Sequence, residues 1–582
     1  MKNNYFNFLL AFLFVSLTTI GFSQEKQVLP KGLTEAEKEL VSQFQFTSER
    51  VTPAPTGPVR AAAEWEEVEY LVVTWQSAYQ NILRQIVQAG VEECKVIITT
   101  QNQASVANYL TNAGIDLTNV SFLNVPWDSI WIRDYAGNTI YSDDVGERAL
   151  TDWIYNRPRP NDDVMPAAHA AQTGLTLYST DSGTNDLVNT GGNYMSDGLG
   201  NAFASNLILE ENAPGNPYGV SVKTETQIDD IMQEYMGIET FIKMNTLTYD
   251  AIHHIDMHMK LLDEETLLVS KYPPGVADGP EIEANIDYVL SNFQSPFGTP
   301  YDVKWIDAPP SVNGNYPDTG GSYRTYSNSV IINKTILVPT YRPEVDTPAL
   351  AYYEELMPGY KVVGIDVDNP GENLISAFGA IHCITHTIGV AEPLWIVHQP
   401  IDEANASSTV SLDAMIKHIS GISQAKVFWR EEGAGPFNEN AMSPTTNDNW
   451  ITDLSIPASG NNVEYYIWAE ANSGKNLTRP LVAPEGYWTI EVENLSVEEW
   501  VQDHISAAYP NPSTGNVTFN MDAIDGSVNI SIHNLLGQQL YSSMVENGDG
   551  KIEIELNSEW QGTLIVTFEG TFGKVHRKII KL

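Results

Sequence analysis

Cys383 is the residue of this chain whose type and setting point most directly to chemistry. It lies in the run Ile-His-Cys-Ile-Thr at residues 381–385, and the chain has only one other cysteine, Cys94. Cys94 begins an apolar, strand-like run, which is typical of a buried core thiol. A Cys94–Cys383 disulfide is less favoured, because a domain of this size can bury its own core. A lone thiol beside histidine predicts a covalent nucleophile.

A second run, residues 254–261, alternates polar and apolar side chains. Successive side chains of a strand point to opposite faces, so this alternation predicts a strand with His254, Asp256, His258 and Lys260 on one face. Neighbouring His and Asp favour a cleft over an ordinary solvated face. A metal site made by His254, Asp256 and His258 is less favoured, because residues two apart on a strand are separated by about 6 to 7 Å.

A third run, residues 127–135, reads Trp-Asp-Ser-Ile-Trp-Ile-Arg-Asp-Tyr and follows a strand-like stretch. Trp127 and Trp131, with Asp128 and Asp134, would form an aromatic and acidic wall, which suits a planar cation. Cysteine and histidine alone would equally suit a cysteine peptidase. The carboxylates favour a positively charged electrophile such as a guanidinium group, whereas a peptidase attacks a neutral carbonyl.

The elements that must position these residues follow an α/β pattern up to about Pro400. Helical spacing of apolar residues over 77–89, 104–114 and 224–236 precedes strand-like runs at 95–100, 120–125 and 239–243. A β-hairpin is predicted over residues 330–341. Beyond residue 403 the pattern changes to short strands, among them 425–430, 463–470 and 486–492, separated by Gly, Asn, Pro and Ser.

Five segments follow from these changes of character. Residues 1–23 read as a signal peptide, and 24–61, rich in proline and charge, read as a pro-segment or loose linker. Residues 62–403 form the predicted catalytic domain, 404–495 an Ig-like β-sandwich, and 502–582 a small all-β unit. No other segment is apolar over the length needed to span a bilayer, so the mature chain is expected to have no membrane-spanning segment.

The charge of the chain limits its partners. It carries 74 acidic and 31 basic residues, a formal net charge of −43. Nucleic acid binding is therefore not expected, since phosphate contacts need a basic face. Cationic small molecules or peptides are favoured as substrates, although excess acid also serves solubility in exported proteins.

The last unit resembles the C-terminal sorting domain of Bacteroidetes type IX secretion cargo. It opens with Tyr-Pro-Asn-Pro-Ser-Thr-Gly at residues 509–515 and ends in a basic tail, Lys574, Arg577, Lys578 and Lys581. The resemblance implies the type IX secretion machinery as a partner, removal of this domain, and a secreted or outer-membrane surface location. A second Ig-like binding module is the alternative.

Five motifs between residues 62 and 400 together resemble the agmatine deiminase and bacterial peptidylarginine deiminase branch of the guanidine-modifying superfamily. They are Trp-Ile-Arg-Asp at 131–134, Gly-Gly-Asn-Tyr-Met-Ser-Asp-Gly at 191–198, His-Ile-Asp at 254–256, Tyr-Ser-Asn-Ser at 326–329 and Ile-His-Cys-Ile-Thr at 381–385. The resemblance implies a pseudo-fivefold α/β propeller, or pentein, with a central active site.

The same resemblance implies a role for each matching residue. Asp134 and Asp256 would hold the guanidinium group, Cys383 would attack its central carbon and His254 would transfer protons. Asn328 would order the site. Loss of ammonia would leave a covalent thiouronium, which water would release as a ureido product. This reaction requires no metal or organic cofactor.

Residues 155–163 bear on the substrate. Arg157 and Arg159 flank a proline and could clamp a carboxylate, which agmatine lacks. In the secreted peptidylarginine deiminases that the chain resembles, the matching arginines bind the α-carboxylate of a C-terminal arginine. Pairing of both arginines with Asp162 and Asp163 is the alternative.

Two further positions separate the branches. Thr190 stands where agmatine deiminases usually carry glutamate, which favours a peptidyl substrate. Ala251 stands where the secreted enzyme has a tyrosine near the substrate carboxylate, and Tyr249 is two positions away. We therefore expect a secreted deiminase that converts peptidyl arginine, with a preference for C-terminal arginine, to citrulline. An agmatine deiminase of putrescine biosynthesis, which gives N-carbamoylputrescine, is the main alternative, ahead of a cysteine peptidase or a non-catalytic surface-binding protein.

Overall fold

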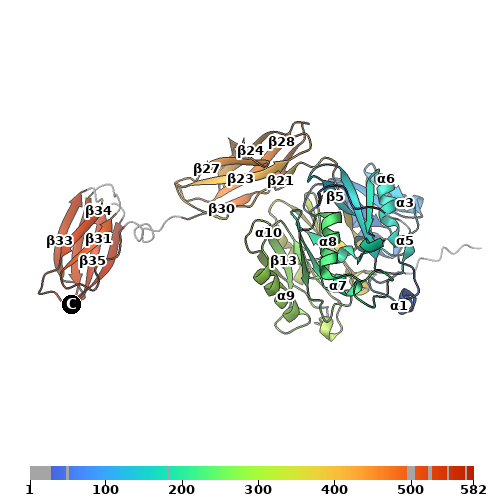
Figure 1. Ribbon diagram of the computed structural model, residues 1–582, viewed down its shortest axis with the longest axis horizontal. Coiled ribbons are helices and arrows are strands. Elements are labelled where there is room, and N and C mark those ends of the chain that lie inside the picture. Colours follow the sequence, from blue (N-terminus) through green and yellow to red (C-terminus); the bar gives the residue numbers. More distant parts are fainter. Residues whose placement is uncertain are drawn as a thin grey trace, which may run out of the picture. The chain divides into compact units, whose positions relative to one another are not determined.

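The computed structural model describes residues 28–46, 52–180, 183–493, 505–521, 527–546, 550–570 and 573–582. The predicted signal peptide at residues 1–23 lies outside these ranges. The chain divides into two compact units, the first comprising Met1–Trp395 with Lys417–Gly421 and the second the remainder. The first is a mixed α/β unit, and the second is built from strands (Figure 1).

The described α/β unit contains five sheets with a common three-strand pattern. In each, the first strand runs antiparallel to the second, and the second runs parallel to the third. At least one helix joins the two parallel strands, as a parallel connection requires. The pattern-forming strands are β20 (His386–Gly389), β2 (Val68–Thr74) and β3 (Lys95–Thr99); β5 (Asn138–Ser142), β6 (Arg148–Tyr155) and β7 (Thr176–Thr180); β9 (Met195–Ser196), β10 (Asn201–Ser205) and β11 (Thr240–Met244); β12 (Met259–Leu261), β13 (Thr266–Lys271) and β14 (Asp302–Asp307); and β15 (Val330–Ile332), β16 (Thr335–Thr340) and β17 (Lys361–Asp366).

Shorter strands extend two of these sheets. β4 (Val120–Leu123) pairs with β3, while β1 (Val59–Ala61) and β8 (Val188–Asn189) join the sheet of β5, β6 and β7. A separate two-stranded hairpin consists of β18 (Asp368–Asn369) and β19 (Glu372–Asn373). The antiparallel pair of β15 and β16 confirms the hairpin predicted over residues 330–341.

The helices follow the predicted spacing of apolar residues. α2 (Gln80–Glu93) buries Ile82, Leu83, Ile86 and Val87 on one face, as the pattern at residues 77–89 predicts. The predictions at 104–114 and 224–236 are confirmed by α3 (Gln103–Asn112) and α8 (Glu225–Met236). The other α-helices of the described chain are α1 (Glu35–Val41), α4 (Ile132–Tyr135), α5 (Pro160–Asp163), α6 (Met165–Thr173), α7 (Leu207–Glu211), α9 (Gly279–Asn292) and α10 (Pro343–Leu356).

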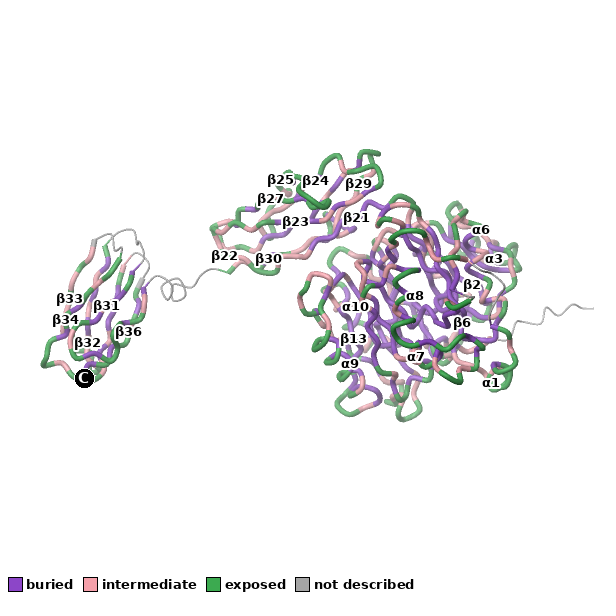
Figure 2. Tube along the Cα trace, in the orientation of Figure 1, coloured by how far each residue is buried: buried purple, intermediate pink, exposed green. Residues whose placement is uncertain are grey.

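The buried interior of the α/β unit runs along its strands, and exposed chain covers its periphery (Figure 2). Strand residues such as Leu71, Val73 and Ile97 are fully buried, and one apolar cluster extends through most of this unit. Trp131 and Cys383 belong to that cluster. Two of the functional motifs are therefore packed into the hydrophobic core of this unit.

The predicted strand over residues 254–261 is wrong. Ile255–Met257 form a 3-10 turn, η4, and only Met259–Leu261 are a strand. The chain turns here because His253 adopts a left-handed φ of 60° and the Met257 amide donates to the His254 carbonyl. The four polar residues of this run therefore do not share one strand face, and all four are buried.

The second unit contains two groups of strands, which are described separately. In the first, β21, β23, β27 and β26 form one sheet and β22, β30, β28, β24, β25 and β29 another. These strands are β21 (Trp395–Val397), β22 (Glu403–Asn405), β23 (Thr409–Lys417), β24 (Ile422–Glu431), β25 (Asn438–Ala441), β26 (Ser443–Pro444), β27 (Asn449–Ser455), β28 (Val463–Ala471), β29 (Asn476–Arg479) and β30 (Trp488–Glu493). The likeness of this group to an Ig domain stays a prediction.

The last group of strands has a hydrophobic core of its own, which includes Phe519, Ile530 and Phe568. It consists of β31 (Asn516–Met521), β32 (Ser527–Asn534), β33 (Gln539–Glu546), β34 (Gly550–Glu555), β35 (Gly562–Gly570) and β36 (Gly573–Lys581). Throughout the described ranges, no helix combines the length and apolar character needed to cross a bilayer.

Candidate active site

The thiol of Cys383 lies at the centre of a buried polar cluster. Cys383 belongs to the 3-10 turn η7 (His382–Ile384) and is fully buried. Its Sγ accepts from Lys31 Nζ at 3.0 Å and from Asn328 Nδ2 at 3.3 Å. Burial and the Asp256 carboxylate raise the pKa of the thiol to about 12, although Lys31 acts to lower it. The thiolate therefore needs a cation beside it.

Two carboxylates face that cation position. Asp134 is on α4 and Asp256 on η4, and each is 1% exposed. Lys31 Nζ lies 3.4 Å from Asp256 Oδ1 and 3.8 Å from Asp134 Oδ1. Burial alone would raise both carboxyl pKa values, but Lys31 and neighbouring imidazoles outweigh burial and lower them, strongly at Asp256. Both groups therefore remain anionic and can bind a cation.

His254 stands beside Asp134 in an unprotonated state. Its Nδ1 lies 3.5 Å from Asp134 Oδ1, and neither ring nitrogen has a hydrogen-bond partner among the described residues. Burial, together with the charge of Lys31, lowers the pKa of His254 to about 4. A neutral imidazole in this position can accept a proton.

Asn328 connects the turns that carry the thiol and the carboxylate. Its Nδ2 donates to the Asp256 carbonyl at 2.9 Å, and its Oδ1 accepts from the His382 amide at 3.0 Å. These bonds fix the two turns relative to each other. The fold thus brings together five side chains that the sequence analysis selected, namely those of Cys383, His254, Asp134, Asp256 and Asn328.

Sequence reasoning missed a second layer of charged groups. His382 Nδ1 lies 2.9 Å from Asp256 Oδ2, and its Nε2 lies 2.7 Å from Glu64 Oε2. Glu64 also pairs with Lys260 and lies 3.6 Å from Arg133 Nη2. One signal could have indicated this layer, because a buried lysine such as Lys260 requires an acidic partner. The sequence alone does not show which acidic residue is that partner.

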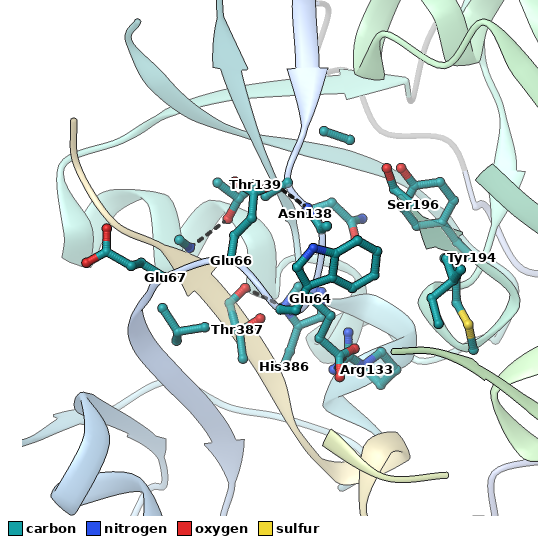
Figure 3. A pocket seen from close by; sticks show the side chains of 18 of the residues that line it. Glu64, Glu66, Glu67, Arg133, Asn138, Thr139, Tyr194, Ser196, His386 and Thr387 are labelled. Atoms are coloured by element: carbon teal, nitrogen blue, oxygen red, sulfur yellow. Dashed lines mark hydrogen bonds and ion pairs between the residues drawn. The ribbon is translucent and has the colours of Figure 1, made fainter. Parts of the chain in front are cut away.

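Glu64 and Arg133 also line a cavity of about 70 Å³, shown in Figure 3 with His386 and Asn138 on its wall. Burial and the Arg133 charge hold the pKa of His386 well below its ordinary value. Through Glu64 and His382, this wall is connected to the carboxylate of Asp256. The second layer therefore orients Asp256 by hydrogen bonds, as supporting groups do around other reactive centres.

The two arginines predicted to clamp a carboxylate instead contact the peptide chain at residues 30–32. Arg157 Nε donates to the Lys31 carbonyl at 3.1 Å. Arg159 Nη2 donates to the Pro30 carbonyl at 2.8 Å and to the Gly32 carbonyl at 3.1 Å.

The alternative partners of these arginines are engaged elsewhere. Arg159 pairs with the Glu37 carboxylate, with 2.8 Å between Nε and Oε1. Asp162 accepts from Ser129 Oγ at 2.7 Å and from the Asp128 amide, also at 2.7 Å. Asp162, the first acidic residue after Arg159, therefore supports the turn at residues 128–129.

The aromatic and acidic wall predicted at residues 127–135 is only partly assembled. Trp131 is fully buried, and its Nε1 donates to the Leu29 carbonyl at 2.9 Å. Asp128 points to α5, where it accepts from the amide and side chain of Asn161, so it does not join Asp134. Tyr249, the possible substitute for the missing tyrosine, is 47% exposed.

Gly192 explains why glycine is needed beside the catalytic centre. A Cβ at this position would lie 2.5 Å from His254 Nδ1 and 2.8 Å from Asp134 Oδ1. We expect Gly192→Ala to lower kcat/KM by about 100-fold or more, since displacing reacting groups by about 1 Å has that effect. Steady-state kinetics measures it. Gly435→Ala, whose Cβ would meet nothing within 4 Å, is the matched control. Full activity of Gly192→Ala would contradict the close packing.

A family model described as Porphyromonas-type peptidyl-arginine deiminase matches residues 58–388. The chain belongs to this family. The protein is therefore a hydrolase that acts on a C–N bond of a guanidino group. A second family model, the secretion system C-terminal sorting domain, matches residues 507–582. This domain directs the protein through the type IX system to the cell surface or beyond.

The chain is also similar to curated proteins and to solved structures. A protein of Shewanella baltica named "Putative agmatine deiminase" is 25% identical over 299 residues, covering 47% of this chain and 76% of the relative. A Marinomonas protein of the same name is 24% identical over 361 residues, which cover 56% of this chain and 94% of the relative. An X-ray structure titled "putative agmatine deiminase" is 20% identical with a TM-score of 0.50, covering 59% and 100%, and shows the α/β fold. A structure from Porphyromonas gingivalis titled "Putative Arginine Deiminase" is 22% identical with a TM-score of 0.49, covering 57% and 99%.

Proposed function

We propose that the protein hydrolyses the guanidinium group of arginine in peptides to citrulline and ammonia. The observation that carries this choice of substrate is the contact of Arg157 and Arg159 with three successive backbone carbonyls, at residues 30–32, beside the catalytic thiol. Agmatine has no peptide carbonyl and would leave these buried donors unused. Buried donors without acceptors are costly, so the arginines favour a substrate with a peptide backbone.

The first half of the proposed reaction forms a covalent intermediate. Asp134 and Asp256 bind the substrate guanidinium, whose charge lowers the pKa of the Cys383 thiol as the charge of Lys31 does. His254 takes the thiol proton while sulfur bonds to the guanidinium carbon. The imidazolium then protonates one amino group of the tetrahedral adduct, and the C–N bond breaks. Ammonia leaves, and a positively charged S-alkylthiouronium remains.

The second half releases the product. Neutral His254 accepts a proton from a water molecule as its oxygen bonds to the thiouronium carbon. The C–S bond then breaks, the hydroxyl of the adduct gives its proton to the departing sulfur, and the thiol is restored as the ureido group of citrulline leaves. The proton on His254 is finally taken up by the released ammonia. Overall, one guanidinium group and one water molecule give one ureido group and one ammonium ion. Asp256, held by His382 and Asn328, keeps the carbon in line with the sulfur.

The arrangement supports recognition of C-terminal arginine as well. Arg157 donates to the carbonyl of Lys31, the residue whose side chain reaches Cys383. In a substrate that ends in arginine, the group at this position would be a carboxylate. An arginine–carboxylate bond is stronger than one to a neutral carbonyl. The five sheets with a shared strand pattern also support the proposed five-bladed propeller around this centre.

A second candidate function is agmatine deimination. The names of the Shewanella and Marinomonas relatives favour it. Its product, N-carbamoylputrescine, would place the reaction in polyamine synthesis, whereas the sorting domain of this chain directs export.

A comparison of three substrates tests the proposal. We expect citrulline formation to be fastest on peptides ending in arginine, slower on peptides with internal arginine and slowest with agmatine. Arg157→Ala should lower kcat/KM for C-terminal arginine by about 10-fold to 100-fold, the range for a charge-assisted hydrogen bond. Colorimetric detection of ureido groups measures all three reactions.

Agmatine and amidated peptides serve as internal controls for Arg157→Ala. Neither has the carboxylate, so the variant should change kcat/KM for them much less. Turnover of agmatine alone would refute the peptidyl substrate. Equal losses on free and amidated C-terminal arginine would refute the carboxylate contact while leaving the deiminase reaction intact.

A further inference from the structure

Residues 28–46, here called the amino-terminal segment, place a lysine inside the catalytic centre. Lys31 is fully buried, and its Nζ lies 3.0 Å from the sulfur of Cys383. The same ammonium faces Asp256 at 3.4 Å and Asp134 at 3.8 Å. Burial lowers the pKa of Lys31, but the two carboxylates and the thiol outweigh burial and raise it, so the group is charged. A cation of the chain itself therefore stands where the guanidinium is proposed to bind.

The backbone around Lys31 is held in the manner of a bound peptide. Four successive carbonyls, those of Leu29, Pro30, Lys31 and Gly32, accept side-chain hydrogen bonds from residues of the α/β unit. The Lys31 amide donates to the Ala377 carbonyl at 2.9 Å. These hydrogen bonds involve only backbone atoms of residues 29–32. They could therefore form with any peptide that has a basic side chain at the position of Lys31.

The rest of the segment anchors this peptide on the α/β unit. Helix α1 begins with a capping box between Thr34 and Glu37, and Glu37 also binds Arg159. Val41, the last residue of the helix, and Phe46, which follows it, are buried in one apolar cluster. The other buried members of that cluster are Ile154, Val188, Tyr218 and Val220. The segment is thus docked through charge at one end and apolar burial at the other.

We propose that the amino-terminal segment is an intramolecular pseudosubstrate, with residues 29–32 in the groove for the substrate peptide and Lys31 in the guanidinium subsite. In this state the deiminase is inactive, and displacement of the segment exposes the site to an arginine-containing peptide. The inference rests on the proposed function, because it identifies the occupied groove as the peptide-binding site.

The chemistry of lysine suits such a role. Its ammonium group pairs with both carboxylates and the thiolate, as a guanidinium does. Its Cε is a saturated carbon with no second nitrogen, so sulfur cannot add to it and release ammonia as it can with a guanidinium carbon. Lys31 therefore binds without turnover. An arginine in the same position would bring an electrophilic carbon to Cys383.

The main rival explanation is that Lys31 is a positioning residue of the reaction. Its charge acts to lower the pKa of Cys383, which could assist the nucleophile. A Cβ on Gly192, however, would lie only 3.1 Å from Lys31 Nζ and 2.8 Å from Asp134 Oδ1. The centre is therefore tightly packed around the ammonium, and a guanidinium would have to replace it. The two explanations predict opposite effects of removing Lys31.

The first test compares two lysines of the same segment in the full chain. Lys31→Ser should raise kcat/KM on peptides ending in arginine by about 10-fold or more, because a tethered competitor acts at roughly millimolar effective concentration. Lys38→Ser is the matched control and should change nothing, since Lys38 is 56% exposed and pairs only with Glu35 in the described structure. A fall in kcat/KM of Lys31→Ser with native-like melting would overturn the inference.

A second pair of variants guards against misfolding of Lys31→Ser. Glu37→Gln keeps Lys31 and weakens the anchor on Arg159, so it should also raise kcat/KM. Lys31→Arg should be converted to citrulline at position 31 by its own Cys383, which mass spectrometry of the tryptic peptide detects. The Lys31→Arg, Cys383→Ser double variant should show no conversion. An unmodified Lys31→Arg in a chain that turns over peptides would contradict the pseudosubstrate.

Labelling with a haloacetamidine separates this inference from the proposed function. The amidinium of the probe needs the same carboxylates, and its carbon–halogen bond alkylates the thiol. In a Cys94→Ser background, Lys31→Ser should be labelled faster than the parent chain, whether or not any peptide is a substrate. Faster labelling without citrulline from any peptide would refute the proposed function only. Equal labelling and equal turnover of parent and Lys31→Ser would refute the pseudosubstrate only.

Discussion

Cys383→Ser is expected to abolish turnover of arginine peptides, with kcat/KM reduced by more than about 10,000-fold. A hydroxyl is a far weaker nucleophile than a thiolate, and removal of a covalent nucleophile has effects of this size in other hydrolases. The protein should still fold, because the serine hydroxyl keeps an acceptor for Lys31 Nζ and Asn328 Nδ2. Citrulline formation should be measured in the full chain and in the Lys31→Ser background, so that an occupied site is not mistaken for an inactive one.

Cys94→Ser is the matched control for this variant. Cys94 packs half-buried against the apolar core, and burial together with the adjacent Glu93 carboxylate raises the pKa of its thiol to about 12. Cys383 has the Lys31 cation beside it, whereas Cys94 has an anion, so we expect Cys94 to be a structural thiol. Its replacement should leave turnover unchanged. With only two cysteines in the chain, Cys94→Ser also leaves Cys383 as the single site for alkylation. Residual turnover of Cys383→Ser above that of the buffer would rule out covalent catalysis.

Asp256→Asn is expected to have the second-largest effect. Asp256 faces the cation at 3.4 Å, and removal of one partner from a buried ion pair costs about 3 to 5 kcal/mol. Transition-state binding should fall accordingly, so kcat/KM should drop by between about 100-fold and 10,000-fold. The asparagine retains the shape of the side chain and one acceptor toward His382, which limits the structural change. Stopped-time assays with peptides ending in arginine measure the loss.

Asp186→Asn is a matched control for the removal of a buried carboxylate. Asp186 is buried and pairs with Lys223 at 2.6 Å, and neither residue is among the groups described around Cys383. This variant should lower the melting temperature while leaving kcat/KM unchanged. If Asp256→Asn lost stability like Asp186→Asn but kept its activity, Asp256 would be a structural residue and the guanidinium would be bound elsewhere.

The spacing of apolar residues was sufficient to predict those helices and strands in which one repeat dominates. α2 and α8 appear where apolar residues repeat at helical spacing, and β15 and β16 form the hairpin predicted around residue 333. The same method failed at residues 254–261. There the polar and apolar alternation of a strand is present, but the left-handed backbone of His253 starts a turn instead. The alternation of residue types carries no information on this backbone torsion, and all four polar side chains are buried in the folded chain.

What the sequence determined by itself is the set of reactive groups. A thiol, an imidazole and carboxylates have intrinsic chemistry, so their types and motifs were enough to select Cys383, His254, Asp134 and Asp256. Their protonation states were not available from sequence, because pKa values depend on burial and on neighbours far along the chain. Only the tertiary structure decided that Glu64 supports His382 and that Lys31 reaches the thiol from 352 positions away. The physical reason is that folding sets the distances between charges, and those distances determine which cation occupies the site.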